Sequence, residues 1–495
     1  MEKAKVRYLN DQFDVEGRWY LPGQNSGLAG VVGCLKYTPD RIVLNLQGSF
    51  TDFVPVDNDG ISKRIVILGI SNEGERFSLF DCLLSHASKS YPGYETCTYY
   101  VSRFYAGEYY LEDEAQLNGI EANFSFFNLD AWLRYHILTM TASDDRKQVN
   151  LSIDFETKNI NKRTYNLQTV GLRLSEEIGY NIQLPKDYFE DETTKVSFRR
   201  HYHLSPDRDE LASPKALLDV IQGYRRLLVL LVGAPMYLSY VEYSIPGNVI
   251  KEGNKEIRTS LITRLFFSQV GNIVDAKKLS PWNPRSILIS RNDIEDNLEI
   301  IITNWFEKEE MFNNCFAAFI SDLYVPGFIE TEFLNTAKGL ESFHRFFVKD
   351  ECKTVPEEND ALLDKERNSI IKFITDNVSY DNIEYFVDRV NYKDEDSFRK
   401  RLQELIFGLP AKLRNKLFGE LNKKGINKFI AQVVDTRNYF THRDSISKYN
   451  NAVVDLGPLL EMHYQLSGIL RYYCLKEVGV DPIIAETRLV NWLPY

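Results

Sequence analysis

The spacing of apolar residues changes once along this chain of 495 residues, and the change limits which folds it can adopt. From about residue 13 to 205, short apolar runs are separated by Gly, Asn, Asp or Pro, which is typical of β-strands and turns. After the turn-rich LSPWNPRS around Pro281 and Pro284, apolar residues recur every three or four positions, as in amphipathic helices. The chain is therefore predicted to be α+β, with a sandwich-like β-rich region before an all-α bundle.

Three domains follow from this pattern. We predict a β-rich sensing or regulatory domain over 1–285, a helical connector over 286–325 and a helical domain over 326–495. One buried helix, Pro214 to Leu231, interrupts the strands of the first domain, because its apolar residues cover most of its circumference. The polar and acidic stretch from Lys349 to Arg367 is expected to be a loop within the helical domain.

The net charge of −11 argues against a protein that coats nucleic acid, because such proteins are basic throughout. One tract differs from the rest of the chain. Between Arg399 and Lys428 there are nine basic residues against two acidic ones. This tract is either a solvated set of helix faces or a surface that contacts RNA phosphates.

The six cysteines are scattered without a Cys-x-x-Cys pair, which is typical of a reduced protein of the cytoplasm. The N-terminus carries charge and no apolar core after it, so no signal peptide is expected. The most apolar run, Leu227 to Leu238, is shorter than the roughly 20 residues that cross a bilayer, so no membrane partner is expected.

A candidate site lies in the stretch KGINKFIAQVVDTRNYFTHRD, from Lys424 to Asp444. Its apolar residues recur at helical spacing and predict a buried stripe, made of Ile426, Phe429, Ile430, Val433 and Val434. The next turn of this face is expected to present Arg437 and Asn438, and the turn after it Thr441 and His442. A buried Arg or Asn without a partner costs about 2–5 kcal/mol, so the stripe is predicted to run into a pocket or an interface.

Two interpretations fit these residues. Arg437 could pair with Asp435 or Asp444, leaving His442 as an interface histidine. Alternatively, Asn438 and His442 share a helix face, and the long side chain of Arg437 can swing toward them. A guanidinium, an amide and an imidazole would then converge on one anion, for which phosphate is the natural candidate.

The string Arg437-Asn438-Tyr439-Phe440-Thr441-His442 resembles the signature of HEPN domains, an Arg followed by a His four to six residues later. The fuller VVDTRNYFTHRD resembles the ApeA-like branch of that superfamily. The upstream TEFLNTAKGLESFHRFF, from Thr331, resembles the first helix of this branch, with its acidic residue at Glu341. The stretches GRWYLPGQ from Gly17 and GVVGCLKY from Gly30 resemble the N-terminal domain that accompanies ApeA-type proteins.

This resemblance implies an endoribonuclease that needs no metal or other cofactor, acts on RNA as a homodimer or higher homo-oligomer, and serves in antiphage defence by abortive infection. A phage-derived trigger or inhibitor is an expected partner. Arg437 and His442 would be catalytic, with Asn438 and Glu341 in support. Glu341 could instead pair with Arg345 at the favourable four-residue spacing. RNA is expected to contact Lys412, Arg414, Lys416, Lys423, Lys424 and Arg443.

RNA can be cleaved without metal because its own 2′-OH is the nucleophile. A histidine accepts that proton and a guanidinium stabilises the charge that grows on the phosphorane. A second group must protonate the departing 5′-oxygen, and a twofold dimer would supply it from a second copy of His442. The expected products carry a 2′,3′-cyclic phosphate and a 5′-OH.

The sequence also contains a glycine cluster and a pair of histidines that resemble ligand sites. The cluster Gly23, Gly27, Gly30 and Gly33 lacks the following Lys-Ser or Lys-Thr and the helix of a nucleotide loop. His201 and His203 could bind a metal together or lie on a basic edge strand. Two alternative functions remain: a helical module that holds a nucleotide or RNA without cutting it, and a carbohydrate- or protein-binding N-terminal sandwich whose helical half serves assembly.

Overall fold

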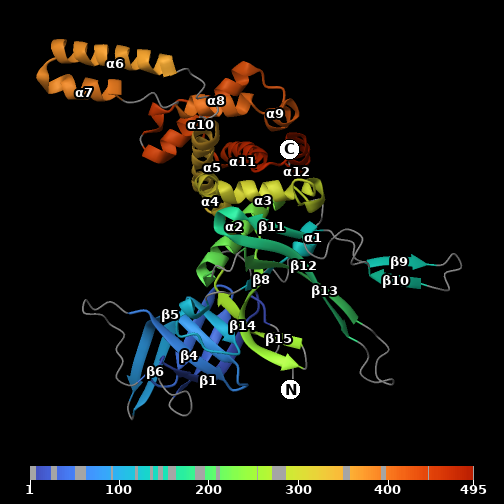
Figure 1. Ribbon diagram of the computed structural model, residues 1–495. Helices are drawn as coiled ribbons and strands as arrows, with labels where there is room; N and C mark the ends of the chain where they lie inside the picture. Colours follow the sequence, from blue (N-terminus) through green and yellow to red (C-terminus); the bar gives the residue numbers. More distant parts are fainter. Residues whose placement is uncertain are drawn as a thin grey trace. The chain divides into compact units, whose positions relative to one another are not determined.

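The computed structural model describes residues 7–23, 30–50, 63–90, 93–117, 121–133, 138–142, 149–153, 163–183, 195–207, 212–252, 255–269, 286–348, 357–391, 397–443 and 445–493. The chain forms two compact units, Met1–Glu307, here called the N-terminal unit, and Lys308–Tyr495, here called the helical unit (Figure 1). Strands dominate the first and helices the second, which confirms the predicted α+β class and its order. The predicted boundary at Pro281 and Pro284 lies outside the described residues.

The N-terminal unit is built mainly from antiparallel strands. They are β1 (Phe13–Tyr20), β2 (Val31–Thr38), β3 (Arg41–Leu46), β4 (Ile65–Ser71), β5 (Arg76–Ser90), β6 (Tyr94–Tyr100), β7 (Arg103–Gly107), β8 (Glu121–Phe126), β9 (Leu138–Ala142), β10 (Val149–Ile153), β11 (Arg163–Leu167), β12 (Leu172–Gln183), β13 (Lys195–Pro206), β14 (Leu238–Glu252) and β15 (Lys255–Phe267). Among the described residues, 13 strands form one sheet in the order β11-β12-β13-β8-β14-β15-β7-β5-β4-β1-β2-β3-β6, and β9 pairs with β10.

Six of these strands close into a barrel. The long strand β5 pairs with β4 through Arg76–Cys82 and with β6 through Leu83–Ser90, and β1, β2 and β3 complete the ring. The sheet thus closes on itself here, where the sequence pattern had suggested two stacked sheets. Closure leaves no exposed edge within the ring, which is one of the ways in which β proteins avoid pairing with other chains.

The indole of Trp19 fills the inner face of this barrel. It is fully buried, and its ring centroid lies 6.0 Å from that of Phe77. A Cβ atom added to Gly69 would lie only 2.2 Å from the indole, and one added to Gly33 would lie 3.1 Å from it. The two glycines therefore provide the space that the indole occupies.

Three helices belong to the N-terminal unit: α1 (Leu129–Leu133), α2 (Pro214–Val232) and α3 (Leu298–Glu307). The helix α2 begins at Ser213, whose side chain accepts a hydrogen bond from the Ala216 amide at 3.1 Å, and ends at Gly233 in the left-handed conformation. It is buried around most of its circumference, which confirms the prediction for this segment. The helix α3 packs against β11 and α2.

A buried ion pair joins the turn before α3 to the sheet. The Arg291 Nε atom lies 3.5 Å from Glu176 Oε1, and the two side chains are only 1% and 5% exposed. The guanidinium also donates a hydrogen bond of 3.3 Å to the Tyr165 hydroxyl. Both charges are removed from water, and the attraction between them offsets the free-energy cost of that removal.

The helical unit contains the remaining helices of the described chain. They are α4 (Glu309–Tyr324), α5 (Ile329–Phe343), α6 (Glu357–Asn377), α7 (Tyr380–Asn391), α8 (Phe398–Phe407), α9 (Ala411–Phe418), α10 (Lys423–His442), α11 (Leu456–Val478) and α12 (Pro482–Trp492). A π-helical turn, His344–Val348, continues α5. None of the helices in the part of the chain that the structure describes combines the length and the apolar character of a membrane span.

The loop expected from Lys349 to Arg367 is wrong from Glu357 onward, because α6 begins there. Residues 349–356 lie outside the described residues. The sequence of α6 contains no Pro or Gly, and nine of its 21 residues are the strong helix formers Ala, Leu, Glu, Lys and Arg, so a helix is compatible with it. Because many of its residues are charged, the segment is polar on average, and this average favours the prediction of a loop.

The helix α5 contacts three of its neighbours, α4, α10 and α11 (Figure 1). Gly339 allows the close approach of α4, because a Cβ atom there would lie 2.5 Å from the Cys315 carbonyl oxygen. Ring contacts join Phe333 to Phe440 of α10 at 6.4 Å and Phe343 to Tyr473 of α11 at 5.6 Å between centroids. This packing places one face of α5 against the C-terminal half of α10.

His463 of α11 is expected to make the stability of the helical unit depend on pH. Burial lowers its pKa to about 4, with a smaller contribution from Arg471. The unfolded chain therefore binds the proton more readily than the native chain, and stability should fall as the pH decreases from about 6.5 to about 4. At pH 4.5 the loss should be on the order of 2–3 kcal/mol in urea unfolding.

The variant His463→Gln isolates this contribution. Glu332, whose carboxylate lies 3.8 Å from His463 Nε2, has a pKa raised by burial and so acts in the opposite direction. The difference between wild type and variant at each pH removes the Glu332 contribution to first order. Equal losses of stability in the two proteins would contradict the prediction.

Candidate active site

The helix α10 carries the candidate site near its C-terminal end. It begins at Asn422, whose side chain accepts a hydrogen bond from the Gly425 amide at 3.0 Å. It ends at Arg443, a non-glycine residue in the left-handed conformation with φ 54°, whose amide donates to the Tyr439 carbonyl at 2.8 Å. His442 is therefore the last helical residue, and Arg437 lies in the second turn from the end.

The buried stripe of α10 continues differently from the prediction. Ile426, Phe429, Ile430 and Val433 are buried as expected, whereas Val434 is only half-buried. Thr436 and Phe440 take the next inward positions, and Arg437 and Asn438 do not. The Thr436 hydroxyl accepts a hydrogen bond of 2.8 Å from the Val453 amide, so its burial leaves no polar group unpaired. Steps of three and four residues, 433 to 436 to 440, keep the stripe on one face.

Arg437 therefore lies beside the buried face, with its side chain 34% exposed. Its Nη2 atom donates to Glu341 Oε2 of α5 at 3.2 Å, and its Nη1 atom donates to Asn438 Oδ1 at 3.2 Å. The Phe398 ring of α8 packs against the guanidinium, 5.7 Å from Cζ to centroid. Three helices thus hold this guanidinium in place.

Glu341 contacts both of the arginines that the sequence offered as partners. While one oxygen accepts from Arg437, the other accepts from Arg345 Nη2 at 3.1 Å. Asp435, a possible partner of Arg437, instead accepts hydrogen bonds from the backbone and side-chain amides of Asn451. Asp444, the other possible partner, lies outside the described residues.

His442 is exposed at the end of α10, one helical turn beyond Asn438. It makes no hydrogen bond or ion pair with the residues that the structure describes. The preceding Thr441 hydroxyl donates to the Arg437 carbonyl at 2.7 Å, which holds this last turn together. The imidazole is thus open to solvent and to a ligand.

The residues expected to bind RNA are not gathered around His442. Lys423 and Lys424 lie in the first turn of α10, about 20 Å from Arg437 and about 28 Å from His442 along the helix. Lys412 and Lys416 lie on α9, and the Arg414 guanidinium donates to the Phe407 carbonyl at 3.1 Å. Arg443 alone of the six is adjacent to His442, with its guanidinium 5.4 Å from the Phe440 ring.

The first turn of α8 contributes residues that the sequence did not single out. Phe398 touches Arg437, and the neighbouring Arg399 and Lys400 are exposed. Both basic residues belong to the basic tract between Arg399 and Lys428, whereas Arg401 of the same tract is buried. Only the packing of α8 on α10 shows which members of the tract lie near the site.

Three other histidines, His201, His203 and His344, have partners of their own. His201 Nε2 lies 3.5 Å from Glu177 Oε2, and His203 Nδ1 lies 2.9 Å from Asn123 Oδ1. Across the described ranges, no group of three or more His, Cys, Asp and Glu side chains is arranged to hold a metal ion. His344, buried in the π-helical turn, hydrogen-bonds Glu404 at 2.6 Å.

The chemistry that this arrangement supports is anion binding with proton transfer. A guanidinium fixed by a carboxylate presents its remaining N–H groups to the oxygens of a phosphate. The exposed imidazole of His442, five residues further along the helix, can accept or donate a proton.

Two family models match the chain. The model of ApeA N-terminal domain 1 matches residues 14–305, which is more than half of the chain, and the Apea-like HEPN model matches residues 334–482. The second range contains Glu341, Arg437, Asn438 and His442. Neither the search of curated proteins nor the search of solved structures gave a match. From the two family matches, in this order along one chain, we conclude that the protein belongs to the ApeA-like HEPN family.

Proposed function

We propose that this protein is a metal-independent endoribonuclease of the HEPN type, acting in antiphage defence as a homodimer with a composite site. The observation that carries the proposal is the Arg437 guanidinium, held by Glu341 at 3.2 Å, five residues before the exposed His442. The match to the Apea-like HEPN model supports it, because the matched range contains these residues.

In the proposed reaction the 2′-OH of RNA attacks the adjacent phosphorus, and the His442 imidazole accepts the hydroxyl proton. The Arg437 guanidinium stabilises the negative charge on the phosphorane oxygens, and Glu341 keeps it oriented. The P–O5′ bond then breaks, and the departing oxygen needs a proton. A second His442, from the other copy in a twofold dimer, would supply it.

An exposed apolar surface supports dimerisation beside the site. Leu456, Leu460 and Tyr464, spaced by four residues on α11, are 69%, 36% and 42% exposed. Phe328, directly before α5, is 83% exposed. Because α5 and α11 run parallel, as the contacts of Thr336 with His463 and of Phe343 with Tyr473 show, these residues lie at one end of the helix pair. We propose that a second copy covers them.

RNA would contact separate basic areas in this proposal. Arg443 and the start of α8 lie near the reacting phosphate, Lys423 and Lys424 lie about 20–28 Å away along α10, and Lys412 and Lys416 lie on α9. An RNA that reaches these areas must be longer than a few nucleotides, and its affinity should fall with salt concentration.

The N-terminal unit would sense a phage-derived trigger. The free thiols of Cys34, Cys82, Cys97, Cys315 and Cys474 support a cytoplasmic location.

The first test is cleavage of total RNA by the full-length protein in the presence of EDTA. We expect fragments with 2′,3′-cyclic phosphate and 5′-OH ends, detected by end-group analysis, at a rate that the chelator does not change. Loss of cleavage on adding EDTA, with recovery on adding Mg²⁺, would overturn the mechanism. RNA that is bound and left intact would instead favour a binding module that does not cut.

Mixing active and inactive subunits tests the composite site. If both copies of His442 act on one phosphate, only dimers of two wild-type subunits are active after exchange with His442→Ala. Activity at constant total protein should then fall as the square of the wild-type fraction. A linear decrease would show that each subunit cleaves alone, and it would contradict the composite site while leaving the ribonuclease intact.

A further inference from the structure

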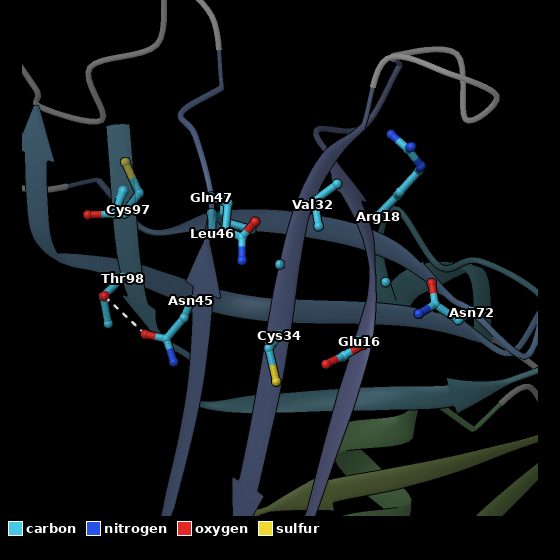
Figure 2. Close-up of a pocket in the computed structure, with 13 residues that line it drawn as sticks. Glu16, Arg18, Val32, Cys34, Asn45, Leu46, Gln47, Asn72, Cys97 and Thr98 are labelled. Atoms are coloured by element: carbon cyan, nitrogen blue, oxygen red, sulfur yellow. Dashed lines mark hydrogen bonds between the residues drawn. The ribbon is translucent and has the colours of Figure 1, made fainter. Parts of the chain in front are cut away.

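A polar groove crosses the outer face of the barrel, far in the sequence from the HEPN domain (Figure 2). Its volume of about 460 Å³ lies within the roughly 300–1,000 Å³ that is usual for small-molecule sites. Strands β1, β2, β3 and β6 form its floor. Its lining is mostly polar, in contrast to the apolar lining of most such sites, so a polar ligand is expected.

The strand register arranges the floor of the groove as one row of side chains. Glu16 is paired with Cys34, Cys34 with Asn45, and Asn45 with Thr98. The Asn72 amide donates to the Glu16 carbonyl at 3.1 Å and so extends the row to β4. Figure 2 shows Asn72 and Thr98 at the two ends of this row, with Glu16 and Cys34 between them.

The middle of the row offers an unpaired carboxylate. The Glu16 carboxylate makes no hydrogen bond or ion pair with the part of the chain that the structure describes, whereas that of Asp14, two residues earlier on the same strand, lies 3.7 Å from Lys36 Nζ. The Asn45 Oδ1 atom accepts from the Thr98 hydroxyl at 3.1 Å, which leaves its Nδ2 donor for a ligand. The groove therefore presents two acceptor oxygens on β1 and, on the other side of Cys34, an amide donor on β3.

This pattern selects among planar ligands of nucleotide size. A carboxylate is matched by an edge with two neighbouring N–H donors, and an amide donor across Cys34 is matched by a carbonyl oxygen at one end of the same edge. Guanine has this edge, with N1–H, N2–H and O6. In adenine, cytosine and uracil an acceptor lies beside the donor and would face a carboxylate oxygen.

We propose that the groove binds a guanine nucleotide, with Glu16 accepting from N1–H and N2–H and Asn45 donating to O6. Arg18 follows Glu16 on the same outward face of β1 and lies in the next row. Its Nη1 atom donates to the Gly30 carbonyl at 3.3 Å, and its other donors are available to the phosphate group. The site lies in the N-terminal unit and is independent of the proposed RNA cleavage.

Calorimetric titration of the full-length protein with GMP, IMP and AMP tests the proposal. We expect GMP to bind, IMP to bind more weakly because it lacks the N2 amine, and AMP to bind weakest. Glu16→Gln should weaken GMP binding by roughly 10- to 100-fold, because its amide would face the donors of the base. Asp14→Asn removes a carboxylate from the same strand outside the groove and should leave binding unchanged.

Three results would overturn the assignment. They are no heat of binding with GMP at millimolar concentration, equal affinity for GMP and AMP, and equal affinity of wild type and Glu16→Gln for GMP. Free arginine is a necessary competitor, because its guanidinium presents the same pair of donors. If arginine binds and GMP does not, the groove recognises a guanidinium instead. Thermal melting of Glu16→Gln checks that the variant folds, as its exposed side chain predicts.

Discussion

Replacement of His442 by alanine is expected to lower RNA cleavage by about 10²–10⁴-fold, because the imidazole is the group proposed to move protons in both halves of the reaction. The side chain is exposed and has no described partner, so the variant should fold and dimerise like wild type. Initial rates with a labelled RNA in EDTA give the measurement. RNA affinity, measured by filter binding, should change little.

Matched variants make this result specific. His86→Ala removes an exposed histidine of β5 in the N-terminal unit and should keep full activity. Arg437→Ala should lose activity to a similar degree, since its guanidinium is proposed to stabilise the transition state. Glu341→Gln should reduce the rate less, because Asn438 and Phe398 still hold the guanidinium. Unchanged cleavage by His442→Ala would remove this residue from the mechanism.

Replacement of Arg291 by methionine is expected to destabilise the N-terminal unit by about 3–5 kcal/mol, because it leaves the Glu176 carboxylate buried without its cation. Urea unfolding followed by fluorescence gives the measurement. Arg173→Met is the control, since Arg173 pairs with Asp207 at 3.6 Å where both side chains are exposed, and should cost less than about 1 kcal/mol.

A double variant separates the ion pair from the loss of packing. With Arg291→Met and Glu176→Leu together, no charge is left unpaired, so the destabilisation should be clearly smaller than the sum of the two single changes. Additive effects, or a loss below about 1 kcal/mol for Arg291→Met alone, would contradict the prediction. Either result would mean that a group other than Arg291 compensates the charge of the Glu176 carboxylate.

The sequence predicted the elements of this fold better than their pairing. Strand and helix positions follow from local spacing, and α2 begins and ends within one residue of the predicted limits, Pro214 and Leu231. The barrel closes because the first half of β5 pairs with β4 and its second half pairs with β6. That pairing is made by contacts between distant parts of the chain, which an alternating pattern does not encode.

The same distinction holds for the candidate site. Arg437, Asn438 and His442 could be found because they share one helix and one short motif. The partner of Arg437 could only be offered as alternatives, since Glu341 lies 96 residues away and meets it through the packing of α5 on α10. The sequence also could not show which residues of the basic tract lie near the site. Lys423 and Lys424 belong to the same helix as Arg437 but lie at its opposite end.

The indole under the barrel wall also has a consequence for how this family can vary. Because the Trp19 ring occupies the space of a Cβ at Gly69, 2.2 Å away, neither position can change alone without a clash or a void. Substitutions there are expected to occur as a pair, a smaller side chain at 19 with a larger one at 69. Among homologues, tryptophan at the first position should therefore coincide with glycine at the second, as a covarying pair from two neighbouring strands.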